Sequence, residues 1–117
     1  MQDTLYNYKA RVVDVYDADT VTLCIDCGFG ITMPKEKVRL YGIDAKEVRG
    51  DEKQLGLVAR DALRHKIMDK DLILQSVKDK KGKYGRKLGT LFLHDEGEWI
   101  NINSWLVENG FAIEKFY

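Results

Sequence analysis

The chain has 117 residues, of which 44% are hydrophobic and 32% are charged, and its 19 basic and 19 acidic residues cancel to a formal net charge of zero. This length allows a single modest core, so we expect residues 1–117 to form one domain. The balanced charge argues against a protein that coats nucleic acid nonspecifically. No apolar run approaches the roughly 20 residues of a membrane span.

The first half of the chain has the pattern of β-strands. Tyr8–Tyr16 is rich in valine, Asp17–Asp19 has the composition of a turn, and Thr20–Asp26 alternates apolar and polar residues. Gly28-Phe29-Gly30 ends this second strand, and a third is expected over Lys37–Ile43.

Cys24 and Cys27 lie within or beside the predicted second strand. A zinc site needs four ligands, and no second Cys/His pair exists. On one strand, a separation of three residues places the two thiols on opposite faces and about 10 Å apart, at roughly 3.3 Å per residue. That distance is too long for a disulfide, so we expect two unpaired thiols.

The apolar period then changes from that of a strand to that of a helix. Residues at positions i, i+3, i+4, i+7, i+8 and i+12 form one apolar stripe: Leu55, Val58, Ala59, Ala62, Leu63 and Ile67. This predicts an amphipathic helix over about Asp51–Met68 that packs on the core, with Arg60, Asp61 and Arg64 on its outer face.

The second half returns to strands. Asp71–Lys78 and Leu88–His94 are predicted as the fourth and fifth strands, Asn101–Asn109 as a short helix, and Phe111–Tyr117 as an extended tail. This order predicts an α+β, mainly β fold: a five-stranded oligonucleotide-binding (OB) barrel with a helix between strands 3 and 4 and a short C-terminal helix.

The charged residues form three clusters. Asp19 follows the first turn. Arg39 lies within the third strand, Asp44 ends that strand, and Glu47 is three residues beyond Asp44. Arg86 belongs to a basic segment. Three carboxylates and two guanidiniums suit phosphodiester cleavage, which needs a hard cation, an activated water and fixed positive charge.

Each cluster taken alone also has an ordinary explanation. Aspartates are common turn formers, and a strand arginine such as Arg39 often forms a structural ion pair. The segment Lys78–Lys87 has six basic residues against one acid, which is typical of a solvated loop.

Four segments in order resemble the staphylococcal (micrococcal) nuclease-like family over nearly the whole chain. They read DADTV (17–21), RLYGIDAKE (39–47), KYGR (83–86) and LVENGFA (106–112). Any one of these motifs is weak, whereas all four at compatible spacing are specific.

The resemblance implies a role for each matching residue. Asp19, Asp44 and the carbonyl of Ala45 would bind Ca²⁺, Glu47 would activate or position water, and Arg39 and Arg86 would bind the scissile phosphate. Lys83 and Tyr84 match contacts to the other phosphate of the nucleotide, and Phe116 stands where the family has a tyrosine. The family's Thr-Pro-Glu is here Ala45-Lys46-Glu47, so activity could be lower or metal preference broader.

The resemblance therefore implies a Ca²⁺-dependent nuclease that acts on DNA and RNA with little sequence preference and leaves 3′-phosphates. We expect a monomer with no membrane association and no obligate protein partner. Residues 1–6 lack a signal-peptide pattern, which fits a cytoplasmic protein or the mature form of a secreted one. The alternatives are a non-catalytic OB-fold nucleic-acid binder and a protein-interaction domain with ordinary ion pairs.

Overall fold

The computed structural model describes residues 6–46, 50–78 and 87–116. Its elements, in chain order, are β1 (Asn7–Asp17), β2 (Thr20–Gly28), β3 (Ile31–Leu40), β4 (Ile43–Ala45), the 3-10 helix η1 (Gly50–Glu52), α1 (Lys53–Ile67), β5 (Asp71–Val77), β6 (Lys87–Asp95), β7 (Glu98–Asn101), α2 (Ile102–Glu108) and β8 (Ala112–Glu114).

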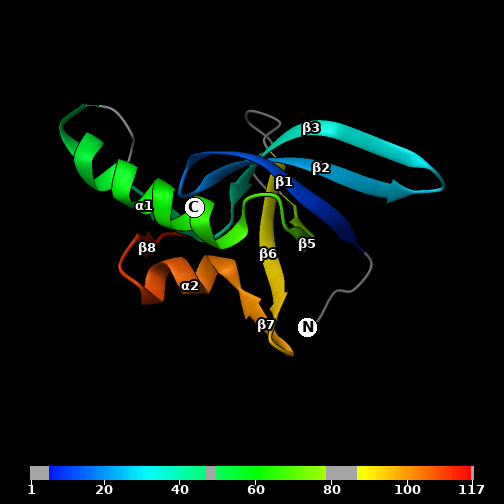
Figure 1. The fold of residues 1–117 in the computed structure, drawn as a ribbon. Coiled ribbons are helices and arrows are strands. Elements are labelled where there is room, and N and C mark those ends of the chain that lie inside the picture. Colours follow the sequence, from blue (N-terminus) through cyan, green and yellow to red (C-terminus); the bar gives the residue numbers. More distant parts are fainter. Residues whose placement is uncertain (1–5, 47–49, 79–86, 117) are drawn as a thin grey trace.

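Five of these strands close into a barrel (Figure 1). The sheet order is β3-β2-β1-β5-β6-β7, and the parallel pairing of β3 with β6 joins the two ends of the five-stranded part. Helix α1 connects the β3–β4 region to β5, and α2 follows β7. The predicted α+β fold, an OB-like barrel with a helix between its third and fourth barrel strands, is confirmed.

The core follows from the alternation of apolar residues along each strand. In β2, Val21, Leu23 and Ile25 are buried, while the residues between them face outward. Leu63 and Ile67 of α1 are fully buried against this core. The apolar stripe of the helix therefore covers the barrel as the sequence predicts, over its C-terminal half.

The N-terminal half of α1 differs from the prediction. Leu55 and Val58 are 61% and 60% exposed, and Gly56 is buried instead. Figure 1 shows the start of α1 lying away from the barrel, so the first turns have little surface to cover.

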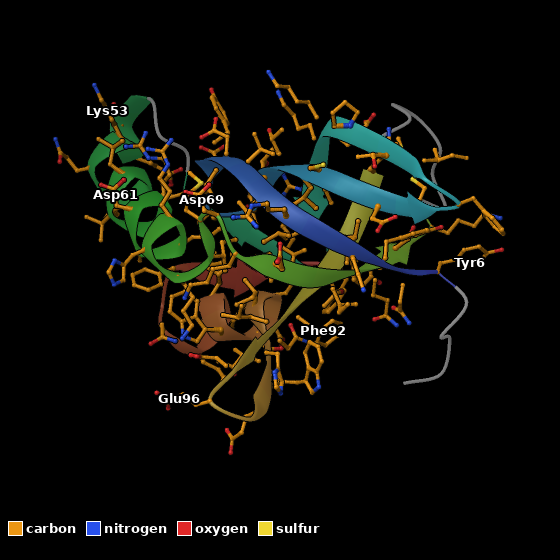
Figure 2. All side chains as sticks on the ribbon, turned by 45° about the vertical axis from the view of Figure 1, so that its right-hand side comes forward. Tyr6, Lys53, Asp61, Asp69, Phe92 and Glu96 are labelled. Atoms are coloured by element: carbon orange, nitrogen blue, oxygen red, sulfur yellow. The ribbon has the colours of Figure 1, made fainter. Side chains whose placement is uncertain are left out.

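The charged face of α1 agrees with the prediction only in part. Lys53 and Asp61 project away from the barrel (Figure 2), but Arg64 turns toward β1 and donates hydrogen bonds to the carbonyl of Val15 at 2.9 and 3.2 Å. Its long side chain lies over the end of β1 and satisfies a backbone carbonyl there.

The predicted third strand, Lys37–Ile43, is wrong at both ends. Strand β3 begins at Ile31 and ends at Leu40, and Gly42 then takes a left-handed conformation with φ +78°. The chain turns there and continues as β4, which pairs with β8 rather than with the barrel. Glycine permits this turn because it has no Cβ.

Cys24 and Cys27 are both free, as predicted. Cys27 packs against the core, whereas Cys24 lines a hollow on the outer side of the sheet, so the two thiols do face opposite sides. Within the part of the chain that the structure describes, no helix is both long and apolar enough to cross a membrane.

Candidate active site

Asp19 lies at the end of the β1–β2 turn and is only 3% exposed. Its Oδ2 accepts a hydrogen bond from the backbone N–H of Ala45 at 2.9 Å, and its Oδ1 accepts one from the hydroxyl of Thr20 at 3.0 Å. A buried carboxylate needs such donors because burial removes it from water. The side chain is therefore fixed between the barrel and β4.

Arg39 stands beside Asp19 because Thr20 and Arg39 are paired across β2 and β3. Its Nη2 lies 3.5 Å from Asp19 Oδ2 and 3.3 Å from Asp44 Oδ1. The same nitrogen donates to the carbonyl of Ile43 at 3.4 Å. Two carboxylates, one from the β1–β2 turn and one from β4, thus converge on one guanidinium group.

Asp44 occupies the centre of β4, not the end of the third barrel strand as predicted. Its position is set by β8, since Asp44 pairs with Ile113 and the N–H of Lys115 donates to the carbonyl of Gly42 at 2.8 Å. Lys115 Nζ also lies 3.9 Å from Asp44 Oδ2. The C-terminal strand therefore supports the site.

Phe116 adjoins this cluster and is 66% exposed. Its ring meets that of Tyr41 edge to face, with centroids 5.6 Å apart and planes at 62°. The ring also covers Gly42, where a Cβ would come within 2.6 Å of Phe116 Cε1. An exposed aromatic face next to a charged cluster can stack on a nucleobase.

Four of the predicted site residues, Glu47, Lys83, Tyr84 and Arg86, lie outside the described residues. Next to the first of them, Lys46 Nζ donates to Glu52 Oε2 at 2.8 Å. This hydrogen bond, followed by the charge of Glu52, raises the pKa of Lys46 above its ordinary value of 10.5. Lys46 is therefore a cation at neutral pH.

The donor set fits a hard divalent cation. The carboxylates of Asp19 and Asp44 lie close to the same Arg39 nitrogen, and carboxylate oxygens are ligands that Ca²⁺ prefers. Within ranges 6–46, 50–78 and 87–116, no three or more His, Cys, Asp or Glu side chains form a group that could hold a metal ion. A metal here would rely on backbone, water or substrate oxygens for the rest of its shell.

Sequence reasoning missed two residues that shape the site. Lys115 precedes Phe116 and pairs with Asp44, and Asn103 of α2 donates to the carbonyl of Tyr41 at 2.9 Å. The signal for Asn103 was a polar residue next to Ile102 on the buried side of a short helix. Lys115 had no signal, because its partner depends on the β4–β8 pairing.

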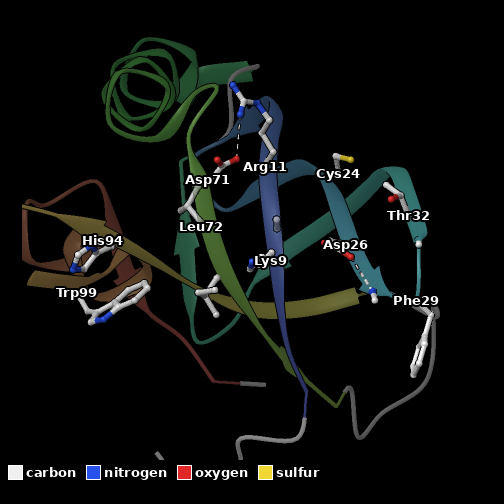
Figure 3. A pocket seen from close by; sticks show the side chains of 14 residues that line it. Lys9, Arg11, Cys24, Asp26, Phe29, Thr32, Asp71, Leu72, His94 and Trp99 are labelled. Atoms are coloured by element: carbon white, nitrogen blue, oxygen red, sulfur yellow. Dashed lines mark hydrogen bonds and ion pairs between the residues drawn. The ribbon is translucent and has the colours of Figure 1, made fainter.

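The hollow that Cys24 lines, of about 760 Å³, lies on the outer side of the sheet (Figure 3). Arg11 pairs with Asp71 at 3.1 Å there, and Lys9 stands opposite Asp26 in the β1–β2 register. The two cations are thus matched by two acids. These four side chains therefore give this hollow no net positive charge that would favour phosphate binding.

The fold and the cluster together define a small OB-like barrel domain with an acid–arginine centre at the junction of β2, β3 and β4. The model of the family described as "Staphylococcal nuclease homologue" matches residues 37–117, and the chain belongs to that family. The match includes Arg39, Asp44 and Ala45.

A curated relative is described as "Uncharacterized protein MJ1439" from Methanocaldococcus jannaschii. It is 27% identical over 131 residues, and the alignment covers 94% of this chain and 60% of the relative. The chain thus spans about three fifths of the length of that protein.

Proposed function

We propose that the protein is a Ca²⁺-dependent nuclease that hydrolyses the phosphodiester bonds of DNA and RNA with little sequence specificity and leaves 3′-phosphates. Membership of the nuclease family supports the hydrolase class. The observation that carries the proposal is the convergence of Asp19 and Asp44 on Arg39 Nη2, at 3.5 and 3.3 Å.

Asp19, Asp44 and the Ala45 carbonyl would hold the cation. Bound Ca²⁺ supplies positive charge near the phosphate and favours ionisation of water. The fixed position of Asp19, with hydrogen bonds to both carboxylate oxygens, keeps the ligands in place before substrate arrives.

Arg39 would bind the scissile phosphate together with Arg86. A guanidinium group can donate two parallel N–H bonds to phosphate oxygens. Glu47 would take a proton from the attacking water, whose oxygen bonds to phosphorus as the bond to the 5′ oxygen breaks. Arg86 would also stabilise the leaving oxygen.

Lys83 and Tyr84 would bind the neighbouring phosphate, and Phe116 would stack on the base. The open face of Phe116 beside Tyr41 supports the stacking role. The change to Ala45-Lys46 removes a hydroxyl and a proline, so we propose a broader metal preference. We further propose that the enzyme acts as a monomer.

The test is to digest single- and double-stranded DNA and RNA with Ca²⁺, Mg²⁺ or EGTA and to identify the product ends. We expect Ca²⁺-dependent cleavage that leaves 3′-phosphates. Glu47→Gln and Arg86→Ala should each lower kcat by about 100- to 1000-fold, the scale of losing one charge-stabilising group.

The matched control is Arg11→Ala, because Arg11 pairs with Asp71 in the outer hollow and should leave cleavage unchanged. Cleavage that persists in EGTA, or in either site variant, contradicts the mechanism. Equal affinity for single-stranded DNA with and without Ca²⁺, with no cleavage, would instead identify a non-catalytic binder.

A further inference from the structure

Asn103, near the start of α2, is 5% exposed. Among the described residues, it and Asp19 are the polar side chains that the fold buries almost completely. Its chain neighbour Ile102 and the next turn's Leu106 are fully buried apolar residues. An apolar side chain would suit this position better, so the asparagine needs a specific explanation.

The side chain joins three parts of the molecule. Its Oδ1 accepts from the N–H of Leu91 in β6 at 3.3 Å. Its Nδ2 donates to the carbonyls of Gly89 and Tyr41, at 3.2 and 2.9 Å. An amide nitrogen has two hydrogens, so the donor capacity of Asn103 is fully used.

The hydrogen bond to Tyr41 falls at the point where the chain leaves the barrel. Tyr41 follows the last residue of β3, and its own N–H donates to the carbonyl of Gly89 at 2.8 Å. Arg39 lies two residues before it and Asp44 three residues after it. The direction of the backbone at Tyr41 therefore sets where β4 places Asp44 relative to Arg39.

We propose that Asn103 is a positioning residue for the active site, and that it acts through Tyr41 by holding β4 against Asp19 and Arg39. Its effect on cleavage rests on the nuclease function proposed above. Its effect on β4 does not, because the contact between Asp19 and the Ala45 N–H is present in the protein alone.

The experiment compares Asn103→Leu, which has similar size and no hydrogen-bonding groups, with Asn103→Asp, which keeps the oxygen facing Leu91 but loses the N–H donors. Asn101→Ala is the matched control. Asn101 caps α2 by accepting from the N–H of Ser104 at 3.1 Å, so its loss weakens the same helix without touching Tyr41.

The first readout is hydrogen exchange of the Ala45 amide, relative to that of buried β1 and β2 amides. We expect at least a tenfold loss of relative protection in both Asn103 variants and none in Asn101→Ala. The second readout is the Ca²⁺ dissociation constant measured by calorimetry, which should rise at least fivefold in the Asn103 variants only.

Equal loss of protection at Ala45 and in β1–β2 would assign Asn103 to general stability and overturn the proposal, as would equal effects in the control. If Asn103→Leu does not fold, the result is decided by Asn103→Asp, from the protection of its Ala45 amide relative to that of the buried β1 and β2 amides. Failure of the wild type to bind Ca²⁺ or cleave would refute the proposed function alone, since the exchange ratio still tests the positioning role.

Discussion

The charges around Asp44 are the main feature at the residue scale. Arg39 Nη2 lies 3.3 Å from one oxygen of this carboxylate, and Lys115 Nζ lies 3.9 Å from the other. Arg39 matches the family pattern, whereas Lys115 is an additional cation. An extra positive charge next to Asp44, a proposed metal ligand, should weaken binding of a divalent cation.

Lys115→Met should therefore strengthen Ca²⁺ binding. Two unit charges about 4 Å apart interact by about 1 kcal/mol in water, and Lys115 is half exposed, so we expect a two- to fivefold lower dissociation constant by calorimetry. Lys35→Met removes the same charge from an exposed position in β3 and is the control. An equal gain in both variants would mean that Lys115 acts only through net charge.

At the element scale, the site depends on the break between β3, which belongs to the barrel, and β4, which pairs with β8. A local sequence pattern cannot reveal this break. The alternation in Thr20–Asp26 correctly predicted β2, because one face of that strand is buried throughout. Val38 and Leu40 alternate with Arg39 and Tyr41, so the sequence suggested one strand that continued to Ile43. The break at Gly42 arises from the non-local pairing of β4 with β8.

The sequence also predicts neither of the short strands β7 and β8 as a paired strand. Strand β7 is only four residues long and pairs with β6 across the turn at Glu96 and Gly97. Strand β8 is three residues long, lies within the tail that was predicted as extended, and pairs with the distant β4. Asp19 and Arg39 could be predicted as neighbours because they lie at matching ends of adjacent strands. The place of Asp44 could not, since it depends on the β4–β8 pair.

Gly42→Ala tests the turn between β3 and β4. Alanine at φ +78° is strained, and its Cβ would also come within 2.6 Å of the Phe116 ring. Gly97 has a similar φ of +82°, and a Cβ added there would meet nothing within 4 Å, so Gly97→Ala isolates the backbone strain.

We expect Gly97→Ala to lower the free energy of unfolding by about 1 kcal/mol and Gly42→Ala by at least twice as much, measured by urea denaturation. Gly42→Ala should also weaken binding of a nucleoside 3′,5′-bisphosphate, because Phe116 must move. Equal losses in the two variants would show that Phe116 does not pack closely on this turn.

At the scale of the whole molecule, the β3–β6 pairing that closes the barrel also supports the candidate active site. Strands β3 and β6 pair in parallel, with Leu40 opposite Gly89. The carbonyl of Gly89 accepts from the N–H of Tyr41 at 2.8 Å and from Asn103 Nδ2 at 3.2 Å. Gly89 therefore contacts three features at once: the β3–β6 pairing that closes the barrel, the start of helix α2 and the start of the β3–β4 turn.

Gly89→Ala should disturb all three together. A Cβ there would collide with the side chain of Leu74 and lie 3.1 Å from the carbonyl oxygen of Gln75. Overpacking of this kind costs about 1–3 kcal/mol, so we expect a loss of that size in urea denaturation. Ser76→Ala is the control, because Ser76 pairs with Gly89 across β5 and β6 and is exposed.

The position of Gly89 in the β3–β6 pairing also predicts which parts of the chain lose stability in Gly89→Ala. If closure and site are coupled there, Gly89→Ala should lower hydrogen-exchange protection at Tyr41 and Ala45 at least as much as at Leu40, while Ser76→Ala leaves all three unchanged. Protection lost only along β5 and β6 would mean that the barrel accommodates the added methyl group away from the candidate site. The β3–β6 pairing and the candidate site would then be independent.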